Sequence, residues 1–374
     1  MDERDARMAL CCAVEPGNLA MTAAVAEHGA SAVFAGLRRS ASRSRWARRA
    51  QTLDLTLVQR SAERNRLRFL IPGDDGWPAA LGDLATADAV QEMGGPPFGL
   101  WVKGDAVLAE ASARGVAIVG SRAATPYGQS VASDLAAGLG GHGISVVSGG
   151  AYGIDAAAHS GALATEAPTV AVMAGGLDKP YPPGNATLLQ RVAGQGLVIS
   201  ELPPGEHPTR ARFLARNRLI AALCPATIIV EAAWRSGARN TVSWASACGR
   251  VVLAVPGPVH SATSTTPHRL IRDAEAVLCT GVADVLELVG PLGRQPPSRP
   301  DQHRRLDALS TDELAVYEAF PARGDLDAGE VALRAGLGLG RCLAILDRIS
   351  ESGLIESSGS GWRLTPRAVT PAGD

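Results

Sequence analysis

Val116-Ala-Ile-Val-Gly120-Ser-Arg122 and Ile144-Ser-Val-Val-Ser148-Gly-Gly150 are two short β-branched runs, and each of them ends in glycine. Similar apolar runs recur at 169–173, 197–200, 227–231 and 251–255, with amphipathic stretches of helical spacing between them. Continuous apolar strands that alternate with helices are typical of a parallel sheet covered on both faces. The sequence therefore predicts an α/β protein with a Rossmann-like parallel sheet core.

The 374 residues are enough for more than one domain. We expect a small helical, SAM-like N-terminal region over 1–66 and the Rossmann-like domain over 67–290. A proline-rich linker over 291–305 precedes a C-terminal winged-helix domain over 306–366 and a tail over 367–374. The winged helix is expected from three helices, the first capped by Thr311, that are followed by a short candidate wing.

Charge composition alone gives no reason to expect a nucleic-acid partner, because the formal net charge is −1. Lysine occurs only at Lys103 and Lys179, so arginine carries nearly all the positive charge. Arginine offers a planar guanidinium that grips phosphate and stacks on bases. Six arginines and no acid lie between Arg38 and Arg49. Such a run is usually a solvated helix face, and nucleic-acid contact is the alternative.

Motifs for metal ions, redox chemistry and membranes are missing from the sequence. The six cysteines have no C-x-x-C spacing and the seven histidines have no metal-ligand spacing. The apolar run at the start is too short for a signal peptide. No stretch approaches the roughly 20 apolar residues of a membrane helix. We therefore expect a cytoplasmic protein with no metal, no cofactor and no membrane partner.

Two glycine-rich turns follow the first strands of the predicted sheet. Gly120, Ser121 and Arg122 form the first, where a glycine lets the next helix N-terminus approach an anion and Arg122 adds a positive charge. The second contains Ser148, Gly149, Gly150 and Gly153, whose backbone N–H groups can form an anion nest. Both turns should lie at the same edge of the sheet, so both are candidate phosphate sites.

Asp155 and His159 follow the second turn and share one helix face, since they are four residues apart. A catalytic Asp–His pair is conceivable, but no nucleophile is implied beside them. We interpret Asp155 and His159 as a structural pair.

A third candidate site is the arginine-rich helix that begins at Arg210. Its polar residues are Arg210, Arg212, Arg216, Asn217 and Arg218. The segment follows a strand end, so we expect it to bind phosphate at the rim of the same crevice. Ser236 and Gly237 precede another helix and offer a further N-terminal phosphate site.

Aromatic residues lie close to these turns, and single-strand binders use such rings to stack bases. The four rings are Tyr127, Tyr152, Phe213 and Trp234. Each is also an ordinary packing residue, and both interpretations stay open.

Known catalytic loops are not found in the sequence. A P-loop needs Gly-Lys-Ser/Thr, whereas Lys103 precedes glycine and Lys179 precedes proline. The first turn also departs from the G-x-G-x-x-G spacing of dinucleotide-binding turns. These departures favour a binding protein that is not an enzyme.

Taken together, these motifs resemble those of the DprA/Smf family of DNA-processing proteins. The resemblance rests on motifs in the family's order: Gly120-Ser-Arg122, Ser148-Gly-Gly-Ala-Tyr-Gly-Ile-Asp155, Gly176-Leu-Asp178 with Tyr181-Pro182, Arg216-Asn-Arg218, Arg235-Ser-Gly237 and Ala254-Val-Pro-Gly257. It implies a homodimer that binds and protects incoming single-stranded DNA and loads the RecA recombinase during natural transformation. It also implies a positive pocket that includes Arg122, with a contribution from Arg210 or Arg212.

The competing hypothesis is an enzyme, a nucleotide phosphoribohydrolase of the Lonely-guy type. Such enzymes use a similar Rossmann variant with a P-G-G-x-G-T-x-x-E phosphate loop. Here the corresponding segment, 235–241, lacks the glycine pair and the trailing glutamate.

Overall fold

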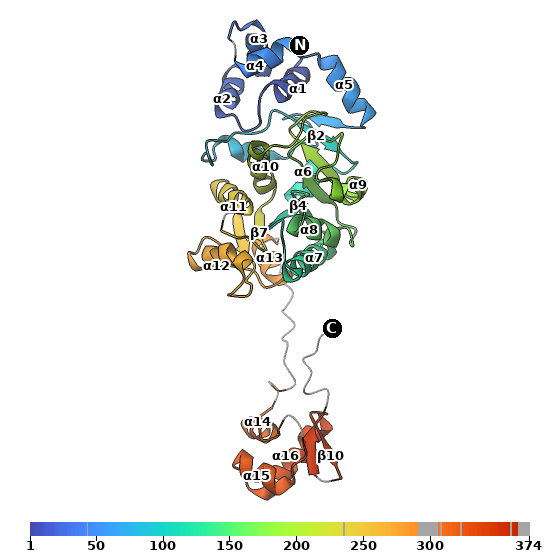
Figure 1. Ribbon diagram of the computed structural model, residues 1–374, viewed down its shortest axis with the longest axis vertical. Coiled ribbons are helices and arrows are strands. Elements are labelled where there is room, and N and C mark those ends of the chain that lie inside the picture. Colours follow the sequence, from blue (N-terminus) through green and yellow to red (C-terminus); the bar gives the residue numbers. More distant parts are fainter. Residues whose placement is uncertain are drawn as a thin grey trace. The chain divides into compact units, whose positions relative to one another are not determined.

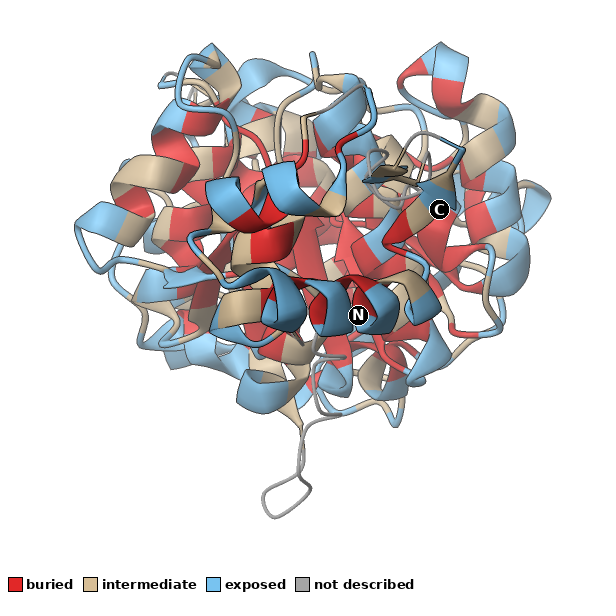
Figure 2. Ribbon diagram, turned by 90° about the horizontal axis from the view of Figure 1, so that it is seen from below, coloured by how far each residue is buried: buried red, intermediate tan, exposed pale blue. Residues whose placement is uncertain are grey.

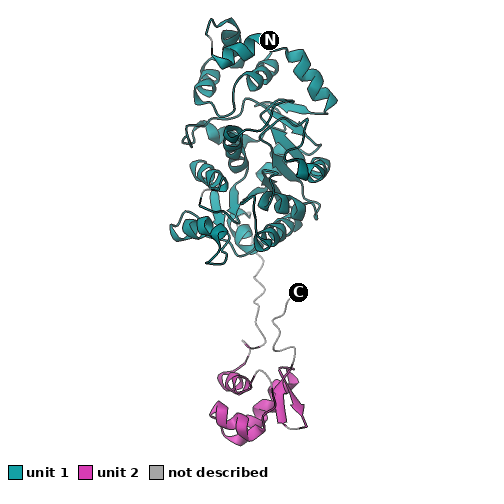
Figure 3. Cartoon of the chain, viewed as in Figure 1, with its two compact units in different colours: residues 1–297 teal, residues 298–374 magenta. Residues whose placement is uncertain are grey.

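A computed structural model describes residues 1–42, 44–234, 236–290, 306, 309–321, 324–359 and 361–365 of the chain. The chain forms two compact units, Met1–Pro297 and Ser298–Asp374 (Figure 3). The expected linker at 291–305 and the tail at 367–374 lie outside the described residues.

A nine-stranded sheet forms the centre of the first unit (Figure 1). Its strands are β1 (Arg68–Leu70), β2 (Leu100–Lys103), β3 (Gly115–Val119), β4 (Ser145–Ser148), β5 (Thr169–Val172), β6 (Leu197–Ser200), β7 (Ala226–Ile229), β8 (Val251–Ala254) and β9 (Val277–Leu278). Their order in space is β1-β2-β6-β5-β4-β3-β7-β8-β9. The seven neighbouring strands β6-β5-β4-β3-β7-β8-β9 are parallel to one another. β2 pairs with β6 in antiparallel orientation, and β1 pairs with β2 in the same way. An α/β fold with a mostly parallel sheet is thus confirmed.

Helices cover both faces of this sheet. They are α6 (Leu108–Ala113), α7 (Pro126–Gly141), α8 (Ile154–Ala162), α9 (Ala186–Gln195), α10 (Arg210–Leu223), α11 (Ala238–Ala247), α12 (Thr265–Arg272) and α13 (Val282–Val289). On one face α7, α8 and α13 bury residues such as Leu135 and Ile154, and on the other α6, α10 and α11 bury residues such as Leu219 and Trp244. Figure 2 shows the buried residues in red on the strands and on the inner sides of the helices. Apolar strands flanked by apolar helix faces produce this three-layer arrangement.

Five helices precede the sheet: α1 (Glu3–Ala13), α2 (Leu19–His28), α3 (Ala30–Arg39), α4 (Arg45–Thr52) and α5 (Leu55–Arg64). The side chains of Asn18, Ser44 and Asp54 cap three of them. Met8 and Cys11 of α1 pack into a buried cluster with Phe69 and Trp101 of the β1–β2 pair. Ala62 of α5 joins the same cluster, so α1 and α5 share a core with that end of the sheet (Figure 1).

The second unit contains α14 (Thr311–Glu318), α15 (Ala328–Ala335) and α16 (Leu339–Glu351), followed by a hairpin of β10 (Ile355–Ser358) and β11 (Gly361–Leu364). Two capping boxes, Ser310 with Glu313 and Asp327 with Glu330, fix the starts of α14 and α15. The expectation that Thr311 caps the first helix is wrong by one residue, because the Ser310 hydroxyl accepts the Glu313 N–H. Across the described residues of both units, no helix has the length and apolarity to cross a bilayer.

Candidate nucleic-acid interface

The loops after β3, β4 and β7 are tied together by backbone hydrogen bonds at the carboxyl edge of the sheet. The Ser121 N–H donates to the Glu231 carbonyl oxygen at 2.6 Å, and the Ile154 N–H donates to the Ser121 carbonyl oxygen at 3.1 Å. Gly153 has φ +75°, and a Cβ there would collide with the carbonyl oxygens of Ser121 and Arg122. Only glycine permits this close approach, which fixes the backbone that carries Arg122.

The anion site expected at the helix N-terminus after Gly120 is already filled by the protein. Thr125 caps α7, and its N–H and hydroxyl donate to the buried Glu231 carboxylate at 2.9 and 2.7 Å. A Cβ at Gly128 would collide with the same carboxylate. This crevice lies where the strand order reverses between β3 and β7, the place where Rossmann folds bind dinucleotides. The Ser121 N–H and the Thr125 N–H thus already have acceptors on Glu231, and phosphate binding by the Gly120–Ser121 backbone stays a prediction.

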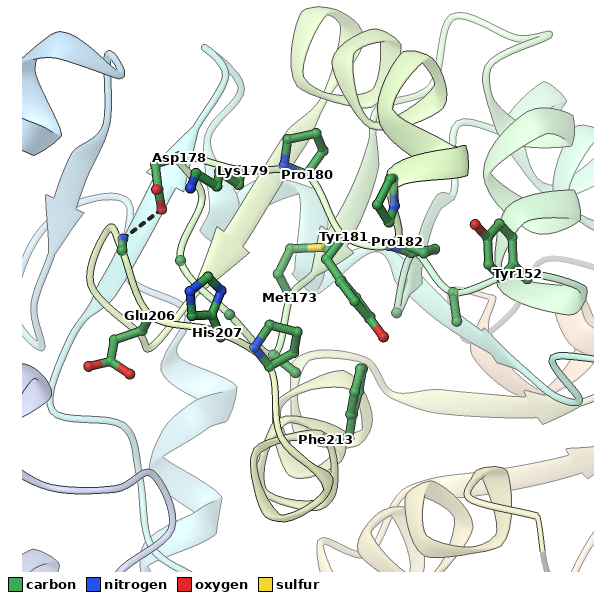
Figure 4. Close-up of a pocket in the computed structure, with 18 of the residues that line it drawn as sticks. Tyr152, Met173, Asp178, Lys179, Pro180, Tyr181, Pro182, Glu206, His207 and Phe213 are labelled. Carbon is green, nitrogen blue, oxygen red and sulfur yellow. Dashed lines mark hydrogen bonds between the residues drawn. The ribbon is translucent and has the colours of Figure 1, made fainter.

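An open pocket of about 340 Å³ lies further along the edge, among the loops after β3, β4, β5 and β6 and the start of α10 (Figure 4). Three aromatic rings line it, those of Tyr152, Tyr181 and Phe213. Phe213 and Tyr181 pack at a centroid distance of 5.9 Å, and the Tyr152 hydroxyl accepts the Gly184 N–H at 3.2 Å. Tyr152 and Tyr181 remain 48% and 41% exposed, so their faces are accessible to a ligand. We call this hollow the aromatic pocket.

Arg122 lies over this pocket as an accessible cation. Its guanidinium carbon is 4.5 Å from the centroid of the Phe213 ring, within cation–π range. The side chain is exposed and forms no hydrogen bond or ion pair with any described residue. Arg122 can therefore offer its donors to an anion that enters the pocket.

The second glycine-rich turn, Ser148–Gly153, forms part of the pocket wall. Ser148 is fully buried, and its hydroxyl donates to the Ile118 carbonyl oxygen at 2.7 Å. Gly149 lines the pocket, and a Cβ there would collide with the Arg216 guanidinium. Gly150 has φ +67°, and its carbonyl oxygen accepts the Asn185 amide. The Ser148 hydroxyl is enclosed and has an acceptor within the protein, and a DNA contact from Ser148 stays a prediction.

The polar residues of α10 fall into different environments. Arg210, at its first position, is exposed and has no hydrogen-bond or ion-pair partner among the described residues. Arg212 is 6% exposed and is held by Glu15 at 2.8 Å and Glu206 at 2.6 Å. These carboxylates raise the pKa of Arg212, the hydrogen bond from Glu15 being the main cause. Arg212 is therefore not the free phosphate-binding cation that we expected.

Arg218 and Asn217 are buried and bonded within the protein, which gives both a structural role, and their predicted DNA contacts stay a prediction. The Arg218 guanidinium is 1% exposed and donates to both Glu201 oxygens at 2.5 and 2.6 Å. The Asn217 amide donates to Asn240 Oδ1 at 3.1 Å and links α10 to α11.

Arg216 lies beneath the aromatic pocket. Its Nη1 donates to the Val172 carbonyl oxygen at 3.0 Å, and its guanidinium carbon is 5.8 Å from the Phe213 centroid. Burial lowers the pKa of Arg216 to about 10. The positive charge of Arg122 lowers this pKa further, and the negative charge of Asp155 raises it. Arg216 thus adds a positive field under the pocket although it is only 6% exposed.

Ser236 and Gly237 stand apart from the aromatic pocket and are not among its lining residues. They directly precede α11, and the Ser236 hydroxyl accepts the Ala238 N–H at 3.3 Å. Their predicted phosphate site is therefore a separate place from the aromatic pocket.

Asp155 and His159 are both buried on α8. His159 Nδ1 lies 2.8 Å from the Thr169 hydroxyl, which itself donates to the Val146 carbonyl oxygen, so the imidazole is the donor. Asp155 accepts the Ala151 N–H at 3.3 Å. Burial raises the pKa of Asp155, and the charge of Arg216 is the strongest opposing cause. Asp155 and His159 therefore form hydrogen bonds with different residues and not with each other.

The His159 imidazole should make stability depend on pH. Burial lowers its pKa from 6.5 to about 4, so the unfolded chain takes up a proton more readily between these values. Because the folded protein keeps His159 neutral, the free energy of unfolding is highest above the pKa of the unfolded chain. It decreases as pH falls below that value, by up to about 1.4 kcal/mol per pH unit. We expect the wild type to lose more unfolding free energy than His159→Gln between about pH 7 and about pH 5 in urea titrations. Parallel pH profiles would show that His159 does not carry the effect, since Asp155 is common to both proteins.

The sequence interpretation missed several residues of the pocket wall. Met173, Lys179, Tyr181 and His207 all line it. Tyr181-Pro182 contributed only to the family resemblance, although its place after a parallel strand was a usable signal for this edge. Among the described residues, no cluster of three or more acidic, histidine or cysteine side chains could hold a metal ion.

Comparisons with known proteins agree on one family. The profile described as DNA recombination-mediator protein A matches residues 68–290. A Mycobacterium tuberculosis relative provisionally named DNA processing protein DprA is 47% identical over 313 residues, 83% of this chain and 79% of the relative. The Streptococcus pneumoniae DNA processing protein DprA is 39% identical over 57% of this chain and 71% of its own.

Two solved structures resemble the described fold at the family level. The crystal structure of Streptococcus pneumoniae DNA processing protein A superposes with a TM-score of 0.63 at 30% identity, covering 77% of this chain and 98% of that one. A Helicobacter pylori DNA processing protein A structure gives 0.51 at 28% identity, covering 60% and 96%. The profile, the sequence relatives and the fold therefore agree: this chain belongs to the DNA recombination-mediator protein A family, also named DprA or Smf.

Proposed function

We propose that this protein binds single-stranded DNA in the aromatic pocket and acts as a recombination mediator, not as an enzyme. In this role it protects incoming single-stranded DNA and loads the RecA recombinase during natural transformation. The observation that carries the proposal is the pairing of a free arginine, Arg122, with accessible aromatic rings in one pocket.

The chemistry of the pocket suits a flexible polyanion with exposed bases. Stacking a base on an aromatic ring contributes about 1–3 kcal/mol and tolerates any sequence. Arg122 and Lys179 supply positive charge at the rim, and Arg216 supplies it from beneath. In duplex DNA the bases are already stacked, so their faces cannot enter such a pocket. The Helicobacter pylori relative has a described single-stranded DNA binding mode, which supports the same role here.

An anisotropy titration with labelled oligo-dT tests this proposal. We expect binding that weakens as salt rises, with a slope of about −0.7 in log K against log salt per phosphate contact. A duplex of the same length should bind poorly. Equal affinity for both forms, or affinity that does not respond to salt, would contradict a single-strand site built on Arg122.

RecA loading is tested by following RecA assembly on single strands already covered by a single-strand binding protein. Our proposal expects faster assembly when this protein is added. An unchanged assembly rate would contradict the proposed RecA loading, but it would not contradict the proposed DNA binding.

Homodimer formation is also part of the proposal. β9 is the last strand of the sheet, and its residues Val277 and Leu278 are 48% and 46% exposed. An exposed apolar edge strand is a natural place for a second copy to bind. Light scattering of the full chain should give twice the monomer mass, and Leu278→Lys should shift the protein toward monomer. A monomeric wild type at micromolar concentration would count against this arrangement.

For the second unit we propose a winged-helix domain that contacts a protein partner in the cytoplasm. Its α14 and α15 carry four acids, Asp312, Glu313, Glu318 and Glu330, and one base, Arg334; Asp312 and Glu313 pair with Arg341 and Arg348 of α16, and the remaining acidic charge disfavours a DNA backbone. A chain truncated after residue 290 should therefore keep its affinity for oligo-dT. A large drop in affinity would assign DNA binding to the second unit.

The phosphoribohydrolase alternative is tested by incubating the protein with adenosine monophosphate and separating the products by chromatography. The hydrogen bonds that Glu231 accepts from Thr125 argue against a free catalytic carboxylate in this crevice. Release of free adenine would nevertheless overturn the non-enzymatic proposal.

A further inference from the structure

We infer that α3 and α4 form a second phosphate-binding surface, over which single-stranded DNA continues after it leaves the aromatic pocket. We call it the N-terminal basic surface and define it by Arg38, Arg39, Arg45 and Arg48. This inference rests on the proposed function and extends it from a pocket to a path.

The N-terminal basic surface consists of accessible cations. Arg38 and Arg39 end α3, and Arg45 and Arg48 lie in α4. All four are exposed, and none forms an ion pair or a side-chain hydrogen bond with a described residue. The sequence from 28 to 53 contains no aspartate or glutamate. The charge is therefore unopposed within these helices.

Two adjoining hollows, the aromatic pocket and a second groove, lie along the path toward this surface. A groove of about 570 Å³ runs beside the loop that precedes α10 and reaches Arg45 and Arg49 of α4. Glu206 and His207 line both the groove and the aromatic pocket. A strand that leaves the pocket past His207 thus enters a groove that leads to α4.

The acidic residues of the groove are largely neutralised. Glu15 binds both Arg212 and Arg49, at 2.8 and 2.9 Å, and Glu206 binds Arg212 at 2.6 Å. These contacts lower the pKa of Glu15, with the Arg212 hydrogen bond as the main cause. Glu92 is the third acid of the lining, so three glutamates face three arginines, Arg45, Arg49 and Arg212, in this groove. The groove is therefore close to neutral, and the basic surface beyond it provides the attraction.

This arrangement also explains what Arg212 does. Arg212 is too enclosed to bind phosphate, but it joins Glu15 of the N-terminal region to Glu206 of the pocket rim. It thereby fixes the position of the N-terminal helices beside the pocket. A single strand is flexible enough to follow such a bent path, whereas a duplex is stiff over this length.

Oligo-dT of two lengths tests the inference on the full chain. The short probe, about 6 nucleotides, is meant to fill the pocket alone, and the long probe of about 20 nucleotides exceeds the site of a typical single-strand binder. The test variant is Arg38→Gln/Arg39→Gln/Arg45→Gln/Arg48→Gln. It should bind the long probe at least about tenfold more weakly at low salt, with a salt slope smaller by about 0.7 for each phosphate that it no longer binds. Its affinity for the short probe should equal that of the wild type.

A matched variant removes four exposed arginines elsewhere: Arg60→Gln/Arg64→Gln/Arg66→Gln/Arg114→Gln. It controls for net charge and should bind the long probe within about twofold of the wild type. If both variants weaken binding equally, or neither weakens it, the N-terminal basic surface is not a DNA path. If the wild type binds neither probe, the proposed function itself fails, which is a separate outcome.

Discussion

Arg122→Ala is expected to lower the affinity for single-stranded DNA by about tenfold to a hundredfold, which is the range for removing one charge-assisted hydrogen bond. The salt slope should fall by about 0.7 if the variant binds one phosphate fewer. The effect should be large because Arg122 also stacks over Phe213 at 4.5 Å, where it stands beside any base that enters the pocket.

The melting temperature of Arg122→Ala should stay close to that of the wild type. The side chain is exposed and has no hydrogen-bond or ion-pair partner among the described residues, so its removal leaves no buried group unpaired. Arg114→Ala is a matched control, because Arg114 is also exposed but precedes β3 at the opposite edge of the sheet. A variant that unfolds would mean that Arg122 is structural, and unchanged affinity would remove it from the DNA site.

The fold was predictable from sequence because it depends on periodic patterns. Apolar runs such as Val116–Val119 are buried on both faces of the sheet and leave a continuous hydrophobic signal. Each loop that follows such a run must lie at the carboxyl edge, so the residues of the turns could be assigned to one rim. Helix caps are less certain, as the shift from Thr311 to Ser310 shows, because neighbouring hydroxyls are equivalent in sequence.

Arg122 and Gly149 were named from sequence and line the aromatic pocket, but which candidate residues are neutralised within the protein could not be predicted, because their partners are distant in sequence. Arg212 is held by Glu15, which lies 197 positions earlier. Glu231, in the loop after β7, fills the crevice after β3 and lies 106 positions away from its partner Thr125. The density of arginines in α10 indicated a phosphate site, but the pattern cannot show which guanidinium groups are neutralised by carboxylates from other elements. Of these arginines only Arg210 is left exposed and unpaired among the described residues.

Glu201→Gln should be the most destabilising single change among those considered. It leaves the Arg218 guanidinium, which is 1% exposed, without its counter-ion. Breaking a buried ion pair by removing one partner costs about 3–5 kcal/mol. Urea titration at neutral pH should show this decrease in the free energy of unfolding. Glu275→Gln is a matched control, because Glu275 pairs with Arg239 on the surface at 3.3 Å, and it should cost less than about 1 kcal/mol.

The double variant Glu201→Leu/Arg218→Met separates the cost of an unpaired charge from the value of the pair. Arg218 Nε is buried without a hydrogen-bond partner, so the pair is not fully satisfied in the folded protein. Apolar replacements of similar volume are often neutral or stabilising for such pairs. The double variant should therefore be more stable than Glu201→Gln, and it should bind oligo-dT as the wild type does, since Arg218 is enclosed. A double variant that folds but binds oligo-dT more weakly would show that Arg218 contributes to DNA binding.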